Sequence, residues 1–184
     1  TIYGASDFAL TEGSGDYTVH MVFGVCSEGH IWILDIYRKQ VDILGGVSRC
    51  VELMLEYEPL QWFFEKVHMQ KAIGTILTKA RKEVGAWTSC IDVSVIGKGR
   101  KDSPQRAGSI AGAMQMGYVH APSAAPWLAD FQYELTKFPN GKNDDQVDAF
   151  ALIGMKLDDL LVAKGLDPVD EGSFKVEGQS LTFN

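Results

Sequence analysis

Acidic side chains stand at two positions of this sequence that suit apolar residues. Asp7 ends a strand-like segment, on the face that also carries Tyr3 and Ala5. Glu65 directly follows the segment 62–64 (Trp-Phe-Phe), the most apolar strand-like segment of the chain. A carboxylate at the edge of such a core must be paired, protonated or bound to a metal ion. The ordinary alternatives are a turn-capping role for Asp7 and an ion pair between Glu65 and a nearby lysine, Lys66 or Lys71.

A third acidic signal lies at the start of the last long helical segment. Asn143 suits a helix N-cap, and Asp144 and Asp145 suit a first turn because the helix dipole favours negative charge there. Asp148 lacks that explanation. At helical spacing Asp145, Asp148 and Leu152 share one stripe, so two acids extend the face that packs on the core. Converging like charges there require something that neutralises them.

Hard divalent cations are the simplest neutralising groups for these acids. Magnesium takes oxygen ligands and is usually held by a few carboxylates together with water and substrate phosphates. The four histidines form neither an HxxxH motif nor a His/Cys set, so zinc is not expected. Three separated acids suit two ions, and two ions suit phosphodiester hydrolysis because one activates water while the other stabilises the leaving oxygen.

The segment 97–106 places four basic residues against one acid between a predicted strand and a predicted helix. A solvated loop is its ordinary interpretation. Beside an acidic active site, however, basic residues would offset the charge of a DNA backbone, and contacts to phosphate carry no sequence information. The sequence therefore predicts a weakly specific DNA contact by Lys98, Arg100, Lys101 and Arg106.

The elements that must position these residues follow an α/β pattern with a mixed sheet. Three strands joined by short turns predict an antiparallel meander, and helices then alternate with further strands. We expect strands at 2–7, 17–26, 30–38, 61–64, 91–96 and 118–119, and helices at 43–58, 68–84, 104–116, 126–136 and 143–162. Residues 1–164 then form one domain, and residues 165–184 form a loosely packed tail.

Composition sets the class of protein. The chain has 184 residues, 46% of them hydrophobic and 22% charged, which predicts one compact domain and excludes disorder. No apolar run approaches the roughly 20 residues of a membrane span, no signal pattern opens the chain, and three scattered cysteines indicate neither disulfides nor zinc. We expect a soluble, intracellular protein. The chain lacks an initiator Met, which suggests that it is part of a longer protein.

The net charge of −7 is unusual for a protein that binds DNA. Its distribution explains it, because nine acids stand against three bases from residue 144 onward, and the rest of the chain is nearly balanced. The net charge therefore does not exclude a nucleic-acid partner.

The order of motifs resembles the nuclease domain of the large terminase subunit of tailed bacteriophages, across nearly the whole chain up to about Met155. The matching segments are Ala5-Ser6-Asp7, Gly15-Asp16-Tyr17-Thr18, Trp62-Phe63-Phe64-Glu65, Ala125-Pro126-Trp127-Leu128, Glu134-Leu135, Phe138-Pro139-Asn140-Gly141 and Asn143-Asp144-Asp145-Gln146-Val147-Asp148-Ala149. The last segment is the most specific, although it has Asn143 where many relatives carry a histidine.

The resemblance implies an RNase H-like fold with a five-stranded mixed sheet, and a metal-dependent endonuclease that cuts concatemeric double-stranded DNA during genome packaging. It matches Asp7, Glu65 and Asp145 to catalytic, metal-binding acids, with Asp148 as a further ligand of two Mg²⁺ or Mn²⁺ ions. Which of Asp144, Asp145 and Asp148 touches metal stays open. An upstream packaging ATPase, the portal protein and the small terminase subunit are the implied partners, in the cytoplasm of an infected bacterium.

Other functions use parts of the same pattern. A RuvC-type Holliday-junction resolvase would share the fold and the acids, and a catalytically silent module would bind DNA or portal protein. An actin- or hexokinase-like ATPase is disfavoured because the early glycine turn after Asp7 is missing. The chain also lacks a GxxxxGK[ST] motif, so we do not expect it to hydrolyse ATP.

Overall fold

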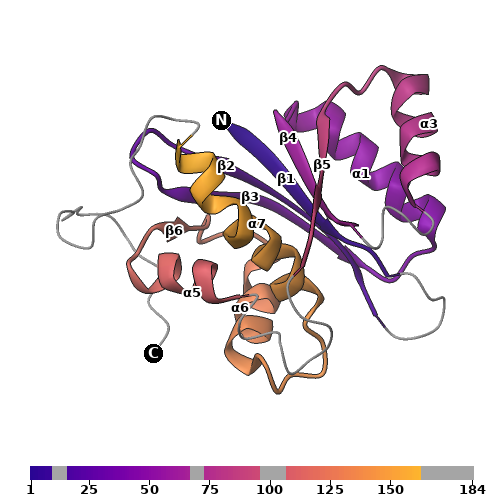
Figure 1. Ribbon diagram of the computed structural model, residues 1–184. Helices are drawn as coiled ribbons and strands as arrows, with labels where there is room; N and C mark the ends of the chain where they lie inside the picture. The colour runs from indigo at the N-terminus through magenta and orange to yellow at the C-terminus, as the bar shows by residue number, and fades with distance from the viewer. Residues whose placement is uncertain (10–15, 67–72, 96–106, 163–184) are drawn as a thin grey trace.

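The computed structural model describes residues 1–9, 16–66, 73–95 and 107–162 (Figure 1). Its centre is a six-stranded mixed sheet in the order β5-β4-β1-β2-β3-β6. β1, β2 and β3 form an antiparallel meander, whereas β4 and β5 continue parallel to β1, and β6 pairs parallel with β3. The strands are β1 (Ile2–Asp7), β2 (Thr18–Val25), β3 (Ile31–Lys39), β4 (Gln61–Glu65), β5 (Ser89–Val93) and β6 (Val119–His120).

Five helices in the described part of the chain cover the two faces of the sheet (Figure 1). One face carries α1 (Ile43–Tyr57) and α3 (Gly74–Val84). The other carries α5 (Gly108–Gln115), α6 (Leu128–Lys137) and α7 (Asp145–Val162). Each face has its own buried cluster: Trp62 and Phe64 belong to the α1 side, and Phe63 belongs to the α7 side. The domain therefore has three layers.

The predicted α/β fold with a mixed sheet is confirmed, with several local differences. The sheet has six strands rather than five, because the short segment expected at 118–119 pairs with β3 one residue further along, at Val119–His120. β5 begins at Ser89 rather than at residue 91 because its register with β4 fixes it, pairing Gln61 with Ser89. α7 begins at Asp145, two residues after the expected Asn143.

Several expectations fall on residues outside the described part. They are the first residues of the helices expected at 68 and 104, the basic residues Lys98, Arg100, Lys101 and Arg106, and the tail at 165–184. The three cysteines are free, as expected.

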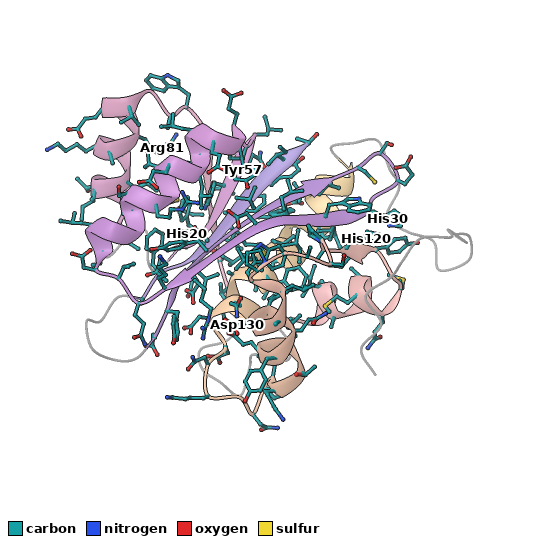
Figure 2. All side chains as sticks on the ribbon, turned by 180° about the vertical axis from the view of Figure 1, so that it is seen from behind. His20, His30, Tyr57, Arg81, His120 and Asp130 are labelled. Carbon is teal, nitrogen blue, oxygen red and sulfur yellow. The ribbon has the colours of Figure 1, made fainter. Side chains whose placement is uncertain are left out.

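A chain of buried hydrogen bonds fixes β1 against its neighbours on the α1 side. Trp62 Nε1 donates to Ser6 Oγ at 2.7 Å, and the Ser6 hydroxyl lies 2.7 Å from His20 Nδ1. His20 lies between the sheet and α1 (Figure 2), and its Nε2 is 2.9 Å from the carbonyl oxygen of Gly46 in that helix. Because that carbonyl accepts, Nε2 carries the proton and Nδ1 accepts from Ser6. Only glycine fits at Gly4, where a Cβ atom would lie 2.3 Å from the Trp62 ring.

The two helices α5 and α7 approach each other at Gly154. A Cβ atom there would lie 2.9 Å from the backbone nitrogen of Ile110 and 3.0 Å from its Cβ. The backbones are therefore in direct contact, and any side chain at this position would force them apart.

We expect His20 to make folding stability depend on pH. Burial lowers the pKa of His20 from 6.5 to about 4. As pH falls below 6.5 the unfolded chain takes up a proton that the folded chain does not, so stability falls, by about 2 kcal/mol between pH 7 and pH 5. Urea unfolding at the two pH values measures this loss, and the variant His20→Gln should lack that component. Equal pH dependence in parent and variant would contradict the assignment.

Candidate active site

The topology brings the predicted strand acids to one edge of the sheet. β1 and β4 are parallel neighbours with Ser6 opposite Phe64, so Asp7 and Glu65 end adjacent strands at the same edge. Asp7 lies two residues after Ala5, and Glu65 lies two residues after Phe63, so each acid is on the same face of its strand as a residue of the α7-side core. Both acids therefore lie toward the face that α7 covers.

α7 brings the helix acids to the same place. It packs against β1, β2 and β4, and its first turn contains Asp145 and Asp148. The Asp148 amide donates to the Asp144 carbonyl at 2.8 Å, so Asp144 is the residue from which the helix starts. Asp144 is thus beside the site as well.

Electrostatic interactions between the acids show how close they are. The pKa of Asp7 is raised well above its ordinary value, first by burial and then by the charges of Asp148, Asp145, Glu65 and Asp144, in that order. Each neighbouring carboxylate disfavours the ionised form of Asp7. The structure therefore groups all the predicted acids around Asp7.

The surroundings of Asp145 include groups that raise its pKa and one that lowers it. Burial raises its pKa to about 6, with smaller contributions from Glu134, Asp16 and Asp144. The backbone N–H of Tyr17 donates to its carboxylate and opposes that rise. Its atom Oδ2 is buried and has no hydrogen-bond partner among the described residues. A buried carboxylate oxygen without a partner is costly, unless a cation binds it.

The chemistry of this group fits a hard divalent cation. In residues 1–9, 16–66, 73–95 and 107–162, no three His, Cys, Asp or Glu side chains are arranged to hold an ion. The carboxylates interact with Asp7, but within the described residues their positions do not form a complete set of ligands for an ion. Oxygen-only donors, mutual repulsion and the orphaned Oδ2 of Asp145 all suit Mg²⁺ or Mn²⁺.

Three of the four histidines lie away from these acids, and His68 falls outside the described residues. His20 is committed to its hydrogen bonds beneath α1, and His30 Nδ1 lies 2.6 Å from His120 Nε2 at the β3–β6 end of the sheet (Figure 2).

Two further acids near Asp145 were not predicted as site residues. Asp16 and Glu134 both raise the pKa of Asp145, and Glu134 is buried, with an exposed fraction of 4%. Both lie in segments that carry the family resemblance, but neither follows an apolar strand or a helix stripe that would mark it as a site residue. Their approach to Asp145 depends on tertiary packing.

The fold is RNase H-like, and its structural relatives are nucleases. The chain resembles the crystal structure of the large terminase nuclease from thermophilic phage G20c, with 20% identity, a TM-score of 0.60, and 82% of this chain and 79% of that chain covered. It also resembles a mutant nuclease domain of the large terminase subunit of bacterial virus Sf6 with manganese and beta-thujaplicinol (11% identity, TM-score 0.57, 85% and 87% covered).

A third relative belongs to another class of nuclease. The Fowlpox virus resolvase in complex with Holliday junction DNA matches with 16% identity and a TM-score of 0.56, over 88% of this chain and 99% of that chain. No protein-family model and no curated protein sequence matches the chain. Within the described residues, no helix is both long and apolar enough to cross a membrane.

We expect Asp7→Asn to stabilise the metal-free protein. Ionisation of Asp7 opposes folding because burial and four neighbouring carboxylates disfavour its charge. In EDTA at pH 7, the melting temperature should rise by about 2 to 4 °C, which corresponds to about 1 kcal/mol. The gain should shrink at lower pH, where Asp7 is protonated in the parent.

The matched control is Asp92→Asn, an exposed acid on β5, which is separated from β1 by β4. It should leave the melting temperature unchanged. A pH-independent loss of stability in Asp7→Asn would show that Asp7 is held by favourable contacts instead.

Proposed function

We propose that this chain is a divalent-metal-dependent endodeoxyribonuclease of the terminase large-subunit class. It would hydrolyse phosphodiester bonds of concatemeric double-stranded DNA by a two-metal mechanism with little sequence specificity. The observation that carries this proposal is the grouping of Glu65, Asp145 and Asp148 around Asp7 at one edge of an RNase H-like sheet. The ordered motifs that resemble terminase nucleases support the particular class.

Each acid has a defined part in this proposal. Asp7, Glu65 and Asp145 are the catalytic residues that would hold two Mg²⁺ or Mn²⁺ ions, and Asp148 is a further ligand. When bound, the ions supply an activated water and neutralise charge on the leaving oxygen. The strands fix Asp7 and Glu65, while α7 and the Tyr17 N–H fix Asp145, so the donors come from rigid elements.

The proposed partner is double-stranded DNA. An acidic site repels phosphate, so basic residues beside it must offset that charge. Lys98, Arg100, Lys101 and Arg106 are proposed for this role, between β5 and α5. In an infected bacterial cytoplasm, a packaging ATPase, the portal protein and the small terminase subunit would be the protein partners.

A Holliday-junction resolvase is the second candidate function. The specific observation in its favour is the likeness to the Fowlpox virus resolvase, which nearly equals the likeness to the terminase nucleases in TM-score. A resolvase would cut a four-way junction in preference to a linear duplex of the same sequence. The terminase proposal expects no such preference.

The proposed activity is tested with the purified chain and plasmid DNA. We expect cleavage with Mn²⁺ or Mg²⁺ and none with EDTA. Asp7→Asn should reduce the rate more than about 100-fold, since losing a metal ligand costs more than losing a neighbour of one. Asp92→Asn should cleave at the parental rate. Cleavage by Asp7→Asn as fast as the parent would overturn the assignment, and a silent parent that still binds DNA would favour the catalytically silent module.

The proposed DNA contacts are tested through salt dependence. Replacing Lys98, Arg100, Lys101 and Arg106 singly by alanine should weaken duplex binding in every sequence tested. The slope of log K against log [salt] is negative, and each loss of a phosphate contact should make it less negative by about 0.9. Fluorescence anisotropy at several KCl concentrations measures this slope. The exposed Lys79→Ala on α3 serves as the control, and an equal effect there would show a general charge effect.

A further inference from the structure

The start of α7 is held by a carboxylate from another helix. Glu134, in α6, directs Oε1 to the backbone N–H groups of Gln146 at 2.6 Å and Val147 at 3.4 Å. Its Oε2 accepts from the side-chain amide of Gln146 at 2.7 Å. The first N–H groups of a helix have no partner within the helix. Glu134 supplies those partners from outside and places a negative charge where the helix dipole favours one.

A second group of contacts ties this carboxylate to the sheet. Arg38, near the end of β3, has Nε 3.4 Å from Glu134 Oε2. Its Nη2 lies 2.8 Å from the side-chain amide of Asn143, whose oxygen accepts from it once the amide is turned over, and its guanidinium lies 3.5 Å above the centre of the Tyr17 ring. Tyr17 in turn donates its backbone N–H to Asp145. The contacts therefore join α6, β3 and the residue before β2 around the first turn of α7.

This arrangement needs an explanation because it places a further buried carboxylate close to Asp145. Glu134 is nearly fully buried and lies close enough to Asp145 to disfavour the charge of that acid. An apolar residue at this position would avoid that repulsion. The buried charge does, however, fix the direction in which the first turn of α7 presents Asp145 and Asp148.

We propose that Glu134 is a positioning residue for the acidic site, acting with Arg38 to hold the first turn of α7 against the sheet. Glu134 itself is not a metal ligand in this inference. The inference rests on the proposed function where it concerns metal binding. Where it concerns the helix start, it rests only on the hydrogen bonds.

The conservative variant Glu134→Gln separates position from charge. The new amide oxygen can accept from the same two backbone N–H groups. In the part of the chain that the structure describes, Gln146 Oε1 is buried and has no hydrogen-bond partner. The Gln146 amide can therefore turn over, so that this oxygen accepts from the new amide nitrogen of residue 134. Glu134→Ala removes every acceptor, and Glu83→Ala, an exposed acid on α3, is the matched control.

Two readouts test the inference. Mn²⁺ affinity is measured by isothermal titration calorimetry, and protection of the Gln146 and Val147 amides by hydrogen exchange in EDTA. Glu134→Ala should weaken Mn²⁺ binding about 10- to 100-fold and lose the protection of both amides. Glu134→Gln should restore protection and bind within about threefold of the parent, because position is retained. Glu83→Ala should match the parent in both readouts.

The outcomes are separable. Parental Mn²⁺ affinity and protection in Glu134→Ala overturn the inference, and so does a Glu134→Gln as defective as Glu134→Ala. If Glu134→Ala does not fold, Glu134→Asp is used instead, because it keeps the charge but shortens the side chain. Parental Mn²⁺ affinity and amide protection in Glu134→Asp would then overturn the inference. A parent that binds no Mn²⁺ overturns the proposed function, whereas loss of amide protection in Glu134→Ala still supports the hold on the helix start.

Discussion

Repulsion between carboxylates is the constraint around which this domain is organised. Asp7 lies among Glu65, Asp144, Asp145 and Asp148, and their charges all disfavour its ionisation. Such a grouping opposes folding, so the surrounding elements must stabilise it independently. They do so with a buried core on each face of the sheet and with the hydrogen bonds of Ser6 and Glu134, to which the Tyr17 N–H adds a hydrogen bond to Asp145 itself. The core packing and the hydrogen bonds of Ser6 do not depend on the charges of the site.

Because side chains alternate along β1, one residue holds the strand in place and the next supplies an acid to the site. Ser6 points to the α1 side, where it links Trp62 to His20, and Asp7 points to the side that α7 covers. The first residue fixes the strand, and the second supplies a ligand. A shift of one residue in the pairing of β1 would exchange the two, so the register with β2 and β4 also fixes which side the acid occupies.

Much of the fold and the grouping of acids could be predicted from the sequence, because both follow from local patterns. The meander follows from short turns between alternating strands, and Glu65 stands out because it ends the apolar segment at Trp62–Phe64. The start of β5 and the pairing of β6 could not be predicted, since both are set by the register with a neighbouring strand. Glu134 could not be predicted as a site residue either, because its role depends on contacts between separate helices. Its three hydrogen bonds join it to residues twelve and thirteen positions away, at the start of α7.

The contact between Gly154 and Ile110 has a mechanical consequence. Two backbones that touch cannot slide past each other independently, so a translation of α7 must carry α5 with it. α5 begins directly after the stretch of chain that contains Arg100 and Arg106, and α7 begins at Asp145. Any change in the position of α5 is therefore passed to α7, the helix whose first turn carries Asp145 and Asp148.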